Sequence, residues 1–353
     1  MLKKVNILRK KIMIGLTRNV GTSIIDVKGN SGPIRRILIS RPNHRLGNLL
    51  LITPLLQEIE TTFPDCKVDL FVKGGLAPIL FKNYKNVDTI ITLPKKPFKE
   101  LLKYIKVWVT LKKYKYDMVI NLDRASSSGR LSTSYVTADN KFFGEYIEEL
   151  ADKYNDYKHM AKNPVYNFRY FLSLMGRKLN ETSVLPLELK LTDAELKLGQ
   201  ELLNELVPTD KKTIALFTYA TGSKCYCENW WGKYYKKLKK AFPDYNFVEI
   251  LPVENISKIN FKAPSFYSKD VREIGAVIAN TAVFIGADSG IMHLAASTHT
   301  PTIGLFSVTD PVKYEPYGYG SIAVNTDKST YDESIAALKS ILKSGKAGRL
   351  KYA

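Results

Sequence analysis

The residue types best suited to chemistry gather at a turn after the apolar run 283–286. Asp288, Ser289 and Gly290 follow that run directly. His293 comes three residues after Gly290, in a small-residue segment with helical spacing. Where a turn connects a strand to the following helix, the backbone N–H groups of the first helical turn and the helix dipole favour a bound phosphate. We therefore predict an anion site here. The alternative is that Asp288 only caps the helix and His293 packs in the core.

A second candidate loop follows another predicted strand, at residues 213–218. It combines small and hydroxyl-bearing residues with one cation: Thr221, Gly222, Ser223 and Lys224. Hydroxyl groups can bond phosphate oxygens, and an ammonium group can neutralise a departing diphosphate. Glu254, at the end of the next predicted strand, could accept both hydroxyls of a ribose. The alternatives are an exposed loop lysine and a surface glutamate.

In the first half of the chain, a polar loop at residues 41–48 separates a predicted strand from an apolar helix. His44 in this loop is of the type that takes a proton near neutral pH, which makes it a candidate general base. Asp123, after the predicted strand 119–122, is a second candidate. Asn48 carries an amide, which has no usable basicity, so it could only position a hydroxyl group. Either candidate base could instead be structural, with His44 orienting a phosphate or a neighbouring loop.

The elements that must position these residues alternate as short β-branched runs and helical patterns, which is typical of doubly wound parallel sheets. A chain of 353 residues also exceeds what one hydrophobic core usually organises. Ligands bind such sheets at the carboxyl ends of their strands. We predict four parts: a basic amphipathic N-terminal extension at 1–34, Rossmann-like domains at 35–185 and 186–330, and a C-terminal helix and tail at 331–353.

The segment around Asp288, continued by residues 300–311, resembles the nucleotide-sugar loop of the heptosyltransferase-like enzymes, glycosyltransferase family nine. The loop at residues 41–54 resembles the amino-terminal loop of the same family. The resemblance implies a GT-B fold, in which two Rossmann-like doubly wound α/β domains face each other across a cleft. It implies an inverting transferase that needs neither metal nor cofactor. The first domain would bind the acceptor, and the second would bind the nucleotide-sugar donor, ADP-heptose by analogy.

Within this resemblance, Lys224 corresponds to a phosphate-contacting lysine of the family and Glu254 to its ribose-binding acid. The family normally carries an aspartate, the proposed base, at the position of Asn48. The resemblance therefore leaves two hypotheses. Either His44 or Asp123 replaces that aspartate, or the chain is a non-catalytic sugar-nucleotide-binding protein.

The chain carries 53 basic and 34 acidic residues, a net charge of +19. Residues 1–36 hold nine Lys or Arg and one acid, and residues 95–115 hold eight Lys and one acid. Such patches attract polyanions, although a merely solvated surface is the simpler interpretation. No nucleic-acid-binding motif accompanies the charge, so nucleic acid is disfavoured. The resemblance implies an anionic glycolipid acceptor, and with it a cytoplasmic protein in peripheral contact with the inner face of the membrane.

Other signals narrow the possible classes further. Three cysteines are too few for a disulfide framework or a tetrahedral zinc site. No Gly-x-Gly-x-x-Gly motif opens the first strand and helix, which disfavours a sugar-nucleotide epimerase. No apolar run is long enough to span a bilayer, and the N-terminus lacks the pattern of a signal peptide. Its apolar residues share one helical face, which predicts a helix lying on a membrane or packing on the core.

Overall fold

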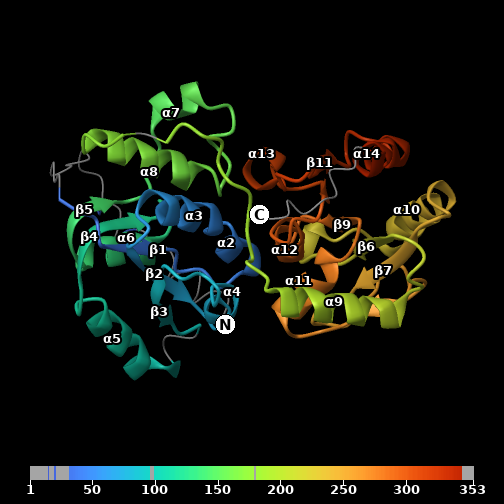
Figure 1. Ribbon diagram of the computed structural model, residues 1–353, viewed down its shortest axis with the longest axis horizontal. Coiled ribbons are helices and arrows are strands. Elements are labelled where there is room, and N and C mark those ends of the chain that lie inside the picture. The colour runs from blue at the N-terminus through green and yellow to red at the C-terminus, as the bar shows by residue number, and fades with distance from the viewer. Residues whose placement is uncertain (1–14, 16–19, 21–31, 96–98, 179, 344–353) are drawn as a thin grey trace. The chain divides into compact units, whose positions relative to one another are not determined.

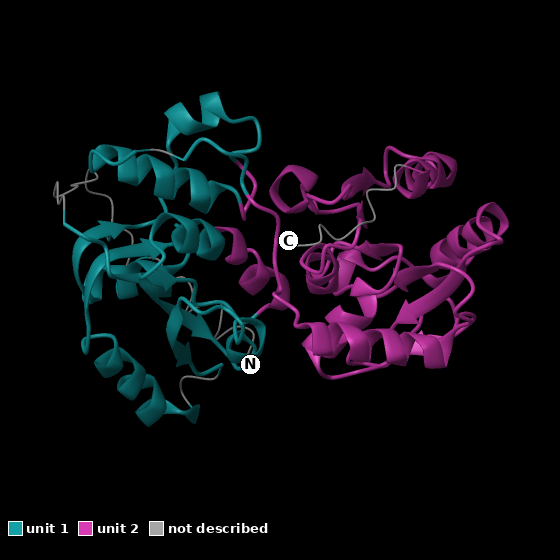
Figure 2. Cartoon of the chain, in the orientation of Figure 1, with its two compact units in different colours: residues 1–44, 55–157, 162–184 teal, residues 45–54, 158–161, 185–353 magenta. Residues whose placement is uncertain are grey.

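The computed structural model describes residues 32–95, 99–178 and 180–343, with the single residues 15 and 20. The predicted N-terminal extension therefore lies almost wholly outside the described residues, as does the end of the tail. The chain forms two compact units, which Figure 2 shows in different colours. Unit 1 comprises residues 1–44, 55–157 and 162–184, and unit 2 comprises residues 45–54, 158–161 and 185–353.

Unit 1 is built on a parallel sheet of five strands among its described residues, in the order β3-β2-β1-β4-β5 (Figure 1). The strands are β1 Arg36–Ser40, β2 Lys67–Lys73, β3 Val87–Leu93, β4 Lys115–Asn121 and β5 Thr137–Phe142. Ile37 of the central strand pairs with Val68 on one side and with Met118 on the other. The strand order reverses between β1 and β4, and ligands bind doubly wound sheets at such a switch point.

The helices of unit 1 connect these strands or follow the last of them. They are α3 Thr53–Thr62, α4 Ala77–Leu80, α5 Leu101–Thr110, α6 Ser127–Tyr135, α7 Glu148–Lys153 and α8 Asn163–Leu174. The sequence predicts a single apolar helix after the loop at residues 41–48, but the structure divides it into α2 Leu46–Leu50 and α3. Pro54 causes the break, because it has no N–H to donate to the carbonyl of Leu50. The Thr53 hydroxyl donates to that carbonyl instead, at 2.7 Å.

Unit 2 contains a parallel sheet of six strands among its described residues, in the order β11-β10-β9-β6-β7-β8. The strands are β6 Thr213–Phe217, β7 Asn246–Ile250, β8 Ser265–Phe266, β9 Val283–Ala287, β10 Thr302–Phe306 and β11 Ile322–Asn325. The order reverses between β6 and β9. The two candidate loops, at residues 218–224 and 288–290, leave the carboxyl ends of these two neighbouring strands. The switch point of unit 2 is therefore the place where the sequence predicts an anion site.

Helices cover both faces of this second sheet. They are α9 Asp193–Leu206, α10 Glu228–Ala241, α11 Val271–Ala279, α12 Gly290–Ala296, α13 Pro311–Tyr314 and α14 Tyr331–Lys343, with a short 3₁₀ helix η2 at Gly222–Lys224. Helices α10 and α14 pack on one face, and α9 packs with α11 on the other (Figure 1). The predicted C-terminal helix, α14, belongs to unit 2, because Ile335, Leu338 and Ile341 enter the core beside Tyr234 and Leu238. Among the described helices, none is long and apolar enough to cross a membrane.

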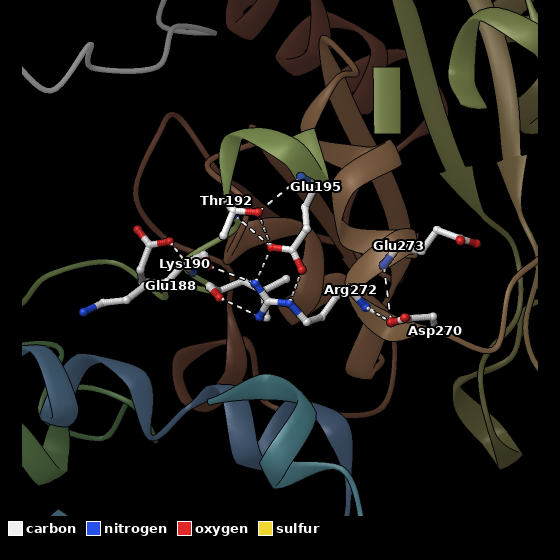
Figure 3. A network of polar contacts seen from close by, with 8 residues as sticks. Glu188, Lys190, Thr192, Glu195, Asp270, Arg272 and Glu273 are labelled. Carbon is white, nitrogen blue, oxygen red and sulfur yellow. Dashed lines mark hydrogen bonds and ion pairs between the residues drawn. The ribbon is translucent and has the colours of Figure 1, made fainter. Parts of the chain in front are cut away.

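A buried arginine fixes the segment through which the chain enters unit 2 (Figure 3). Arg272, at the start of α11, is 2% exposed. Its guanidinium donates to the two carboxylate oxygens of Glu195 at 2.6 and 2.8 Å, and to the carbonyls of Leu189 at 3.1 Å and Lys190 at 2.9 Å. Glu195 also closes a capping box with Thr192 at the start of α9. One planar cation thus ties α11, α9 and the entering segment together, since its several N–H groups are directed at different partners.

Replacement of Arg272 by Met should lower the free energy of unfolding by about 3–5 kcal/mol, because it leaves a carboxylate and two carbonyls without their shared donor. Lys197→Met is the matched control on α9. Lys197 makes an exposed ion pair with Glu201 at 4.0 Å, which contributes less than about 1 kcal/mol. Urea unfolding followed by tryptophan fluorescence measures both variants. Equal losses in the two would contradict the role assigned to Arg272.

Candidate functional site

Asp288, directly after β9, joins three loops at the carboxyl edge of the unit 2 sheet. Its Oδ2 accepts a hydrogen bond from Lys224 Nζ at 2.5 Å and another from the Thr309 hydroxyl. These partners come from the loops after β6 and β10. The Asp288 side chain is 6% exposed, whereas that of Lys224 is 33% exposed. Since an ammonium group has three N–H donors, Lys224 can hold Asp288 and still donate to a ligand.

The structure brings the two predicted loops together and adds a residue that the sequence interpretation missed. Thr309 lies within residues 300–311, but no residue pattern marks its hydroxyl as a partner of Asp288. The alternative in which Asp288 caps α12 is wrong. Ser289 is the cap, and its side chain accepts from the N–H of Met292 at 3.4 Å. The Asp288 carboxylate is instead directed to the lysine and the threonine, because it sits one residue before the cap.

The remaining residues of the loop after β6 lie on the surface. Thr221, Gly222 and Ser223 are exposed, and Thr221 precedes the 3₁₀ turn that ends at Lys224. Gly222 has a φ of +67°, a conformation that glycine adopts without strain. The turn therefore presents two hydroxyls beside the lysine while leaving them accessible to a ligand.

His293 is buried in α12 and is 4% exposed. Burial lowers its pKa to about 4. The charge of Asp288 opposes that change, and His159 and Lys224 add to it. Its Nδ1 is buried and has no hydrogen-bond partner among the described residues. Because a buried polar atom without a partner is costly, this nitrogen is suited to a ligand atom. His293 is thus a packed histidine and also a candidate contact, which combines the two predicted interpretations.

His159 lies near His293 and was not predicted. It is 1% exposed. Its Nδ1 accepts from the N–H of Ala161 at 3.2 Å, so its Nε2 carries the proton and donates to the carbonyl of Glu315 at 2.9 Å. These bonds fix a neutral tautomer beside the neutral His293. Only the fold could show this pair, since the two residues are far apart in the sequence.

Two glycines allow helix α2 to lie directly against α12. A methyl group at Gly290 would come within 3.0 Å of Leu46 Cβ and 3.2 Å of the Gly47 nitrogen. A methyl group at Gly47 would lie 2.7 Å from Cδ2 of His293. This contact places Asn48, which is half-buried, in unit 2. The predicted domain at 35–185 assigned Asn48 to the first domain, and the structure differs because packing, not chain order, decides the unit.

The predicted ribose-binding acid, Glu254, is exposed on the loop after β7. A neighbouring glutamate that was not predicted anchors this loop. Glu249 is fully buried, and its carboxylate accepts from the hydroxyls of Thr218 at 2.5 Å and Ser257 at 2.6 Å. Burial raises the pKa of Glu249, and these two hydrogen bonds oppose the change. Glu249 thus positions the loop that carries Glu254.

The candidate bases of the first domain lie beside the switch point of unit 1. His44 is exposed. Asp123 follows β4, where its Oδ1 accepts from the N–H of Ala125 at 3.0 Å and its Oδ2 lies 3.7 Å from Arg41 Nη1. Arg41, which was not predicted as a site residue, is buried and also donates to the carbonyl of Leu122 at 3.0 Å. Both oxygens of Asp123 therefore have partners, and His44 is an exposed residue of the loop after β1.

Comparisons with known proteins agree with this geometry. The sequence model of Glycosyltransferase family 9 (heptosyltransferase) matches residues 269–336, which include Asp288, His293 and Thr309. The chain is 23% identical over 296 residues to lipopolysaccharide heptosyltransferase 3 of Escherichia coli (strain K12), covering 77% of this chain and 82% of the relative. It is 24% identical over 287 residues to lipopolysaccharide heptosyltransferase 1 of Campylobacter coli, covering 75% and 82%.

Residues 269–336 thus resemble glycosyltransferase family 9, and most of the chain is similar to named heptosyltransferases. Solved structures show the same fold. The family 9 glycosyl transferase of Veillonella parvula DSM 2008 has a TM-score of 0.69 at 18% identity, covering 89% of this chain and 98% of its own. E. coli heptosyltransferase WaaC with ADP has a TM-score of 0.65 at 17% identity, covering 87% and 99%. The predicted GT-B fold class is confirmed.

Replacement of Gly47 by Ala should lower the free energy of unfolding by about 1–3 kcal/mol, the usual cost of overpacking a tight contact. The added methyl group would collide with the buried ring of His293. Gly232→Ala on α10 is the matched control, because its methyl group would meet nothing within 4 Å. There the loss of a helical glycine should stabilise the protein by up to about 1 kcal/mol. A Gly47 variant as stable as the native protein would contradict the described contact.

The neutral state of His293 predicts a specific pH dependence. Its folded pKa of about 4 lies below the ordinary value of 6.5, so the unfolded chain binds more protons between these values. The contribution to stability is full above about pH 6.5 and is lost as the pH falls towards 4. Urea unfolding across this range should show a steeper acid loss for the native protein than for His293→Gln. A ring signal assigned to His293 by NMR that titrates above pH 6 would contradict the burial.

Proposed function

We propose that the protein transfers a heptose from ADP-heptose to a lipopolysaccharide-type glycan, with inversion at the anomeric carbon and without a metal ion. One observation carries the proposal: the Asp288–Lys224 pair holds a partly exposed ammonium group beside the first turn of α12. Ammonium and backbone amides together are what a nucleoside diphosphate requires. The named relatives are lipopolysaccharide heptosyltransferases, and one solved neighbour contains ADP, which supports this class of donor.

In the proposed complex, phosphate oxygens accept from Lys224, from the first-turn amides of α12 and from the hydroxyls of Thr221 and Ser223. Glu254 accepts from the ribose. When the glycosidic bond breaks, negative charge grows on the departing diphosphate, and Lys224 stabilises that charge. A fixed ammonium supplies here the electrostatic assistance that Mg²⁺ supplies in other transferases. The donor half of the reaction then depends on residues of unit 2.

Inversion requires the acceptor hydroxyl to attack from the side opposite the departing diphosphate, while a base takes its proton. Asn48 cannot be that base, because an amide does not accept a proton near neutral pH. We assign the role to His44, because it is exposed in the loop after β1 and an imidazole takes a proton near neutral pH. Asn48 positions a sugar hydroxyl by hydrogen bonding.

The acceptor proposed is an anionic glycolipid at the cytoplasmic face of the membrane. The net charge of +19 supports an anionic acceptor.

One competing function is a sugar-nucleotide-binding protein without turnover. The presence of Asn48 favours it, because an amide cannot act as a base. That protein would retain the arrangement of Lys224 and Asp288 and lack an effective base.

The decisive assay supplies ADP-heptose and a heptose-deficient lipopolysaccharide core, and detects the lengthened glycan by mass spectrometry. Replacement of Lys224 by Met should lower kcat/KM by a factor of about 10²–10³, the usual effect of removing one electrostatic contact to a charged transition state. Lys236→Met, at an exposed position on α10, is the matched control and should retain activity. Chelation of divalent metal ions should leave the native rate unchanged.

Replacement of His44 by Gln in the same assay should lower kcat while leaving ADP-heptose binding intact. Full activity in this variant would remove His44 as the base. Tight ADP-heptose binding by the native chain without any product would favour the non-catalytic function. Absence of ADP-heptose binding, measured by calorimetry, would overturn the donor assignment.

A further inference from the structure

Helix α5 of unit 1 attaches to its sheet by one face only. Tyr104, Val107 and Trp108 pack against the buried cluster that contains Phe71 and Leu111. The Trp108 ring makes an edge contact with Phe71 at 5.9 Å between ring centroids. These contacts fix the helix firmly in place, so its opposite face has a defined direction.

The outer face of α5 is apolar although it lies in solvent. Four large apolar side chains of this ten-residue helix are more than half exposed: Leu101 56%, Leu102 84%, Ile105 51% and Val109 58%. Their spacing places them along one side of the helix. Exposed apolar side chains that gather in this way, instead of being scattered singly, mark an interaction surface.

Lysines surround this apolar stripe. Those described as exposed are Lys99, Lys103, Lys106, Lys112 and Lys113. The carboxylate of Glu100 neutralises the charge of Lys103, with which it forms an ion pair at 2.9 Å. The ammonium of Lys112 lies 4.5 Å from the ring centre of Tyr135, which orients it at the end of the helix. The outer face of α5 therefore combines apolar side chains that can enter a lipid bilayer with positively charged lysines beside them.

The positive charge around the apolar face of α5 distinguishes between the possible binding partners. A second copy of the chain would bring the same lysines against it. The chain's own N-terminal segment would bring nine Lys or Arg and a single acid within residues 1–36. Both are repelled by a positive border. An anionic lipid bilayer matches both the lysines and the apolar stripe of α5. Its negative headgroups can contact the lysines, and its apolar interior lies directly below them.

We propose that α5 is the membrane-docking helix of this protein. It lies in the plane of an anionic bilayer surface, with Leu101, Leu102, Ile105 and Val109 among the upper acyl chains and the lysines on lipid phosphates. This inference goes beyond the proposed transferase reaction. Its test uses binding alone, so failure of either proposal leaves the other intact.

The experiment measures flotation of the full chain with vesicles of phosphatidylglycerol and phosphatidylethanolamine, and with vesicles of phosphatidylcholine alone. The native protein should bind the anionic vesicles and not the neutral ones. Leu102→Ser/Ile105→Ser should weaken that binding at least about tenfold, because two inserted side chains are lost. Leu174→Ser/Leu198→Ser is the matched control, since both positions are exposed apolar residues on other helices, and it should bind like the native protein.

A second measurement reports insertion directly. In a Leu102→Trp variant, lipids brominated in their acyl chains should quench more tryptophan fluorescence than they quench in the native protein. Native-like flotation of the Leu102/Ile105 variant, or no added quenching, would overturn the proposal and leave binding to another segment. A dimer in light scattering that this variant converts to a monomer, without vesicle binding by the native chain, would assign the surface to a second copy.

Discussion

The buried carboxylate of Asp288 is the group on which the carboxyl edge of the unit 2 sheet depends. A carboxylate is costly to bury, and the ammonium of Lys224 and the hydroxyl of Thr309 offset that cost. Because these partners come from the loops after β6 and β10, one charge fixes the relative positions of three loops. The site is therefore organised by unit 2 itself, and a diphosphate would meet a lysine already in place.

The same region depends on a steric constraint, the close approach of α2 to α12. Gly47 and Gly290 leave no side chain between the two helices, so the helix backbones nearly touch. That closeness covers His293 and withdraws it from water, which is the cause of its lowered pKa. It also carries Asn48 into unit 2. A residue of the amino-terminal loop is thus held by the unit that contains Asp288 and Lys224.

Basic residues occupy two different kinds of environment in this chain. Lys224 is paired, one-third exposed and placed at a switch point, as suits a contact to a specific anion. The lysines of α5 lie around an apolar stripe, as suits an extended anionic surface. Net charge alone does not separate these roles, because it counts every lysine alike. The partner of each lysine and its place in the fold distinguish them.

The sequence by itself determined the strongly apolar elements and the chemical types at the site. The predicted strand at residues 213–218 and the apolar run at residues 283–286 correspond to the buried strands β6 and β9. The polar strand β5 and the division between α2 and α3 were missed, since local pattern does not show a pairing partner or the effect of Pro54. Lys224 and Asp288 were each predicted as anion-site residues. Only the tertiary structure showed that these two residues bond to each other and that Thr309 also bonds Asp288. It also showed that Glu249 anchors the loop of Glu254 and that Asn48 belongs to unit 2. Strand order and helix packing join residues far apart in the chain, and residue spacing carries no record of those contacts.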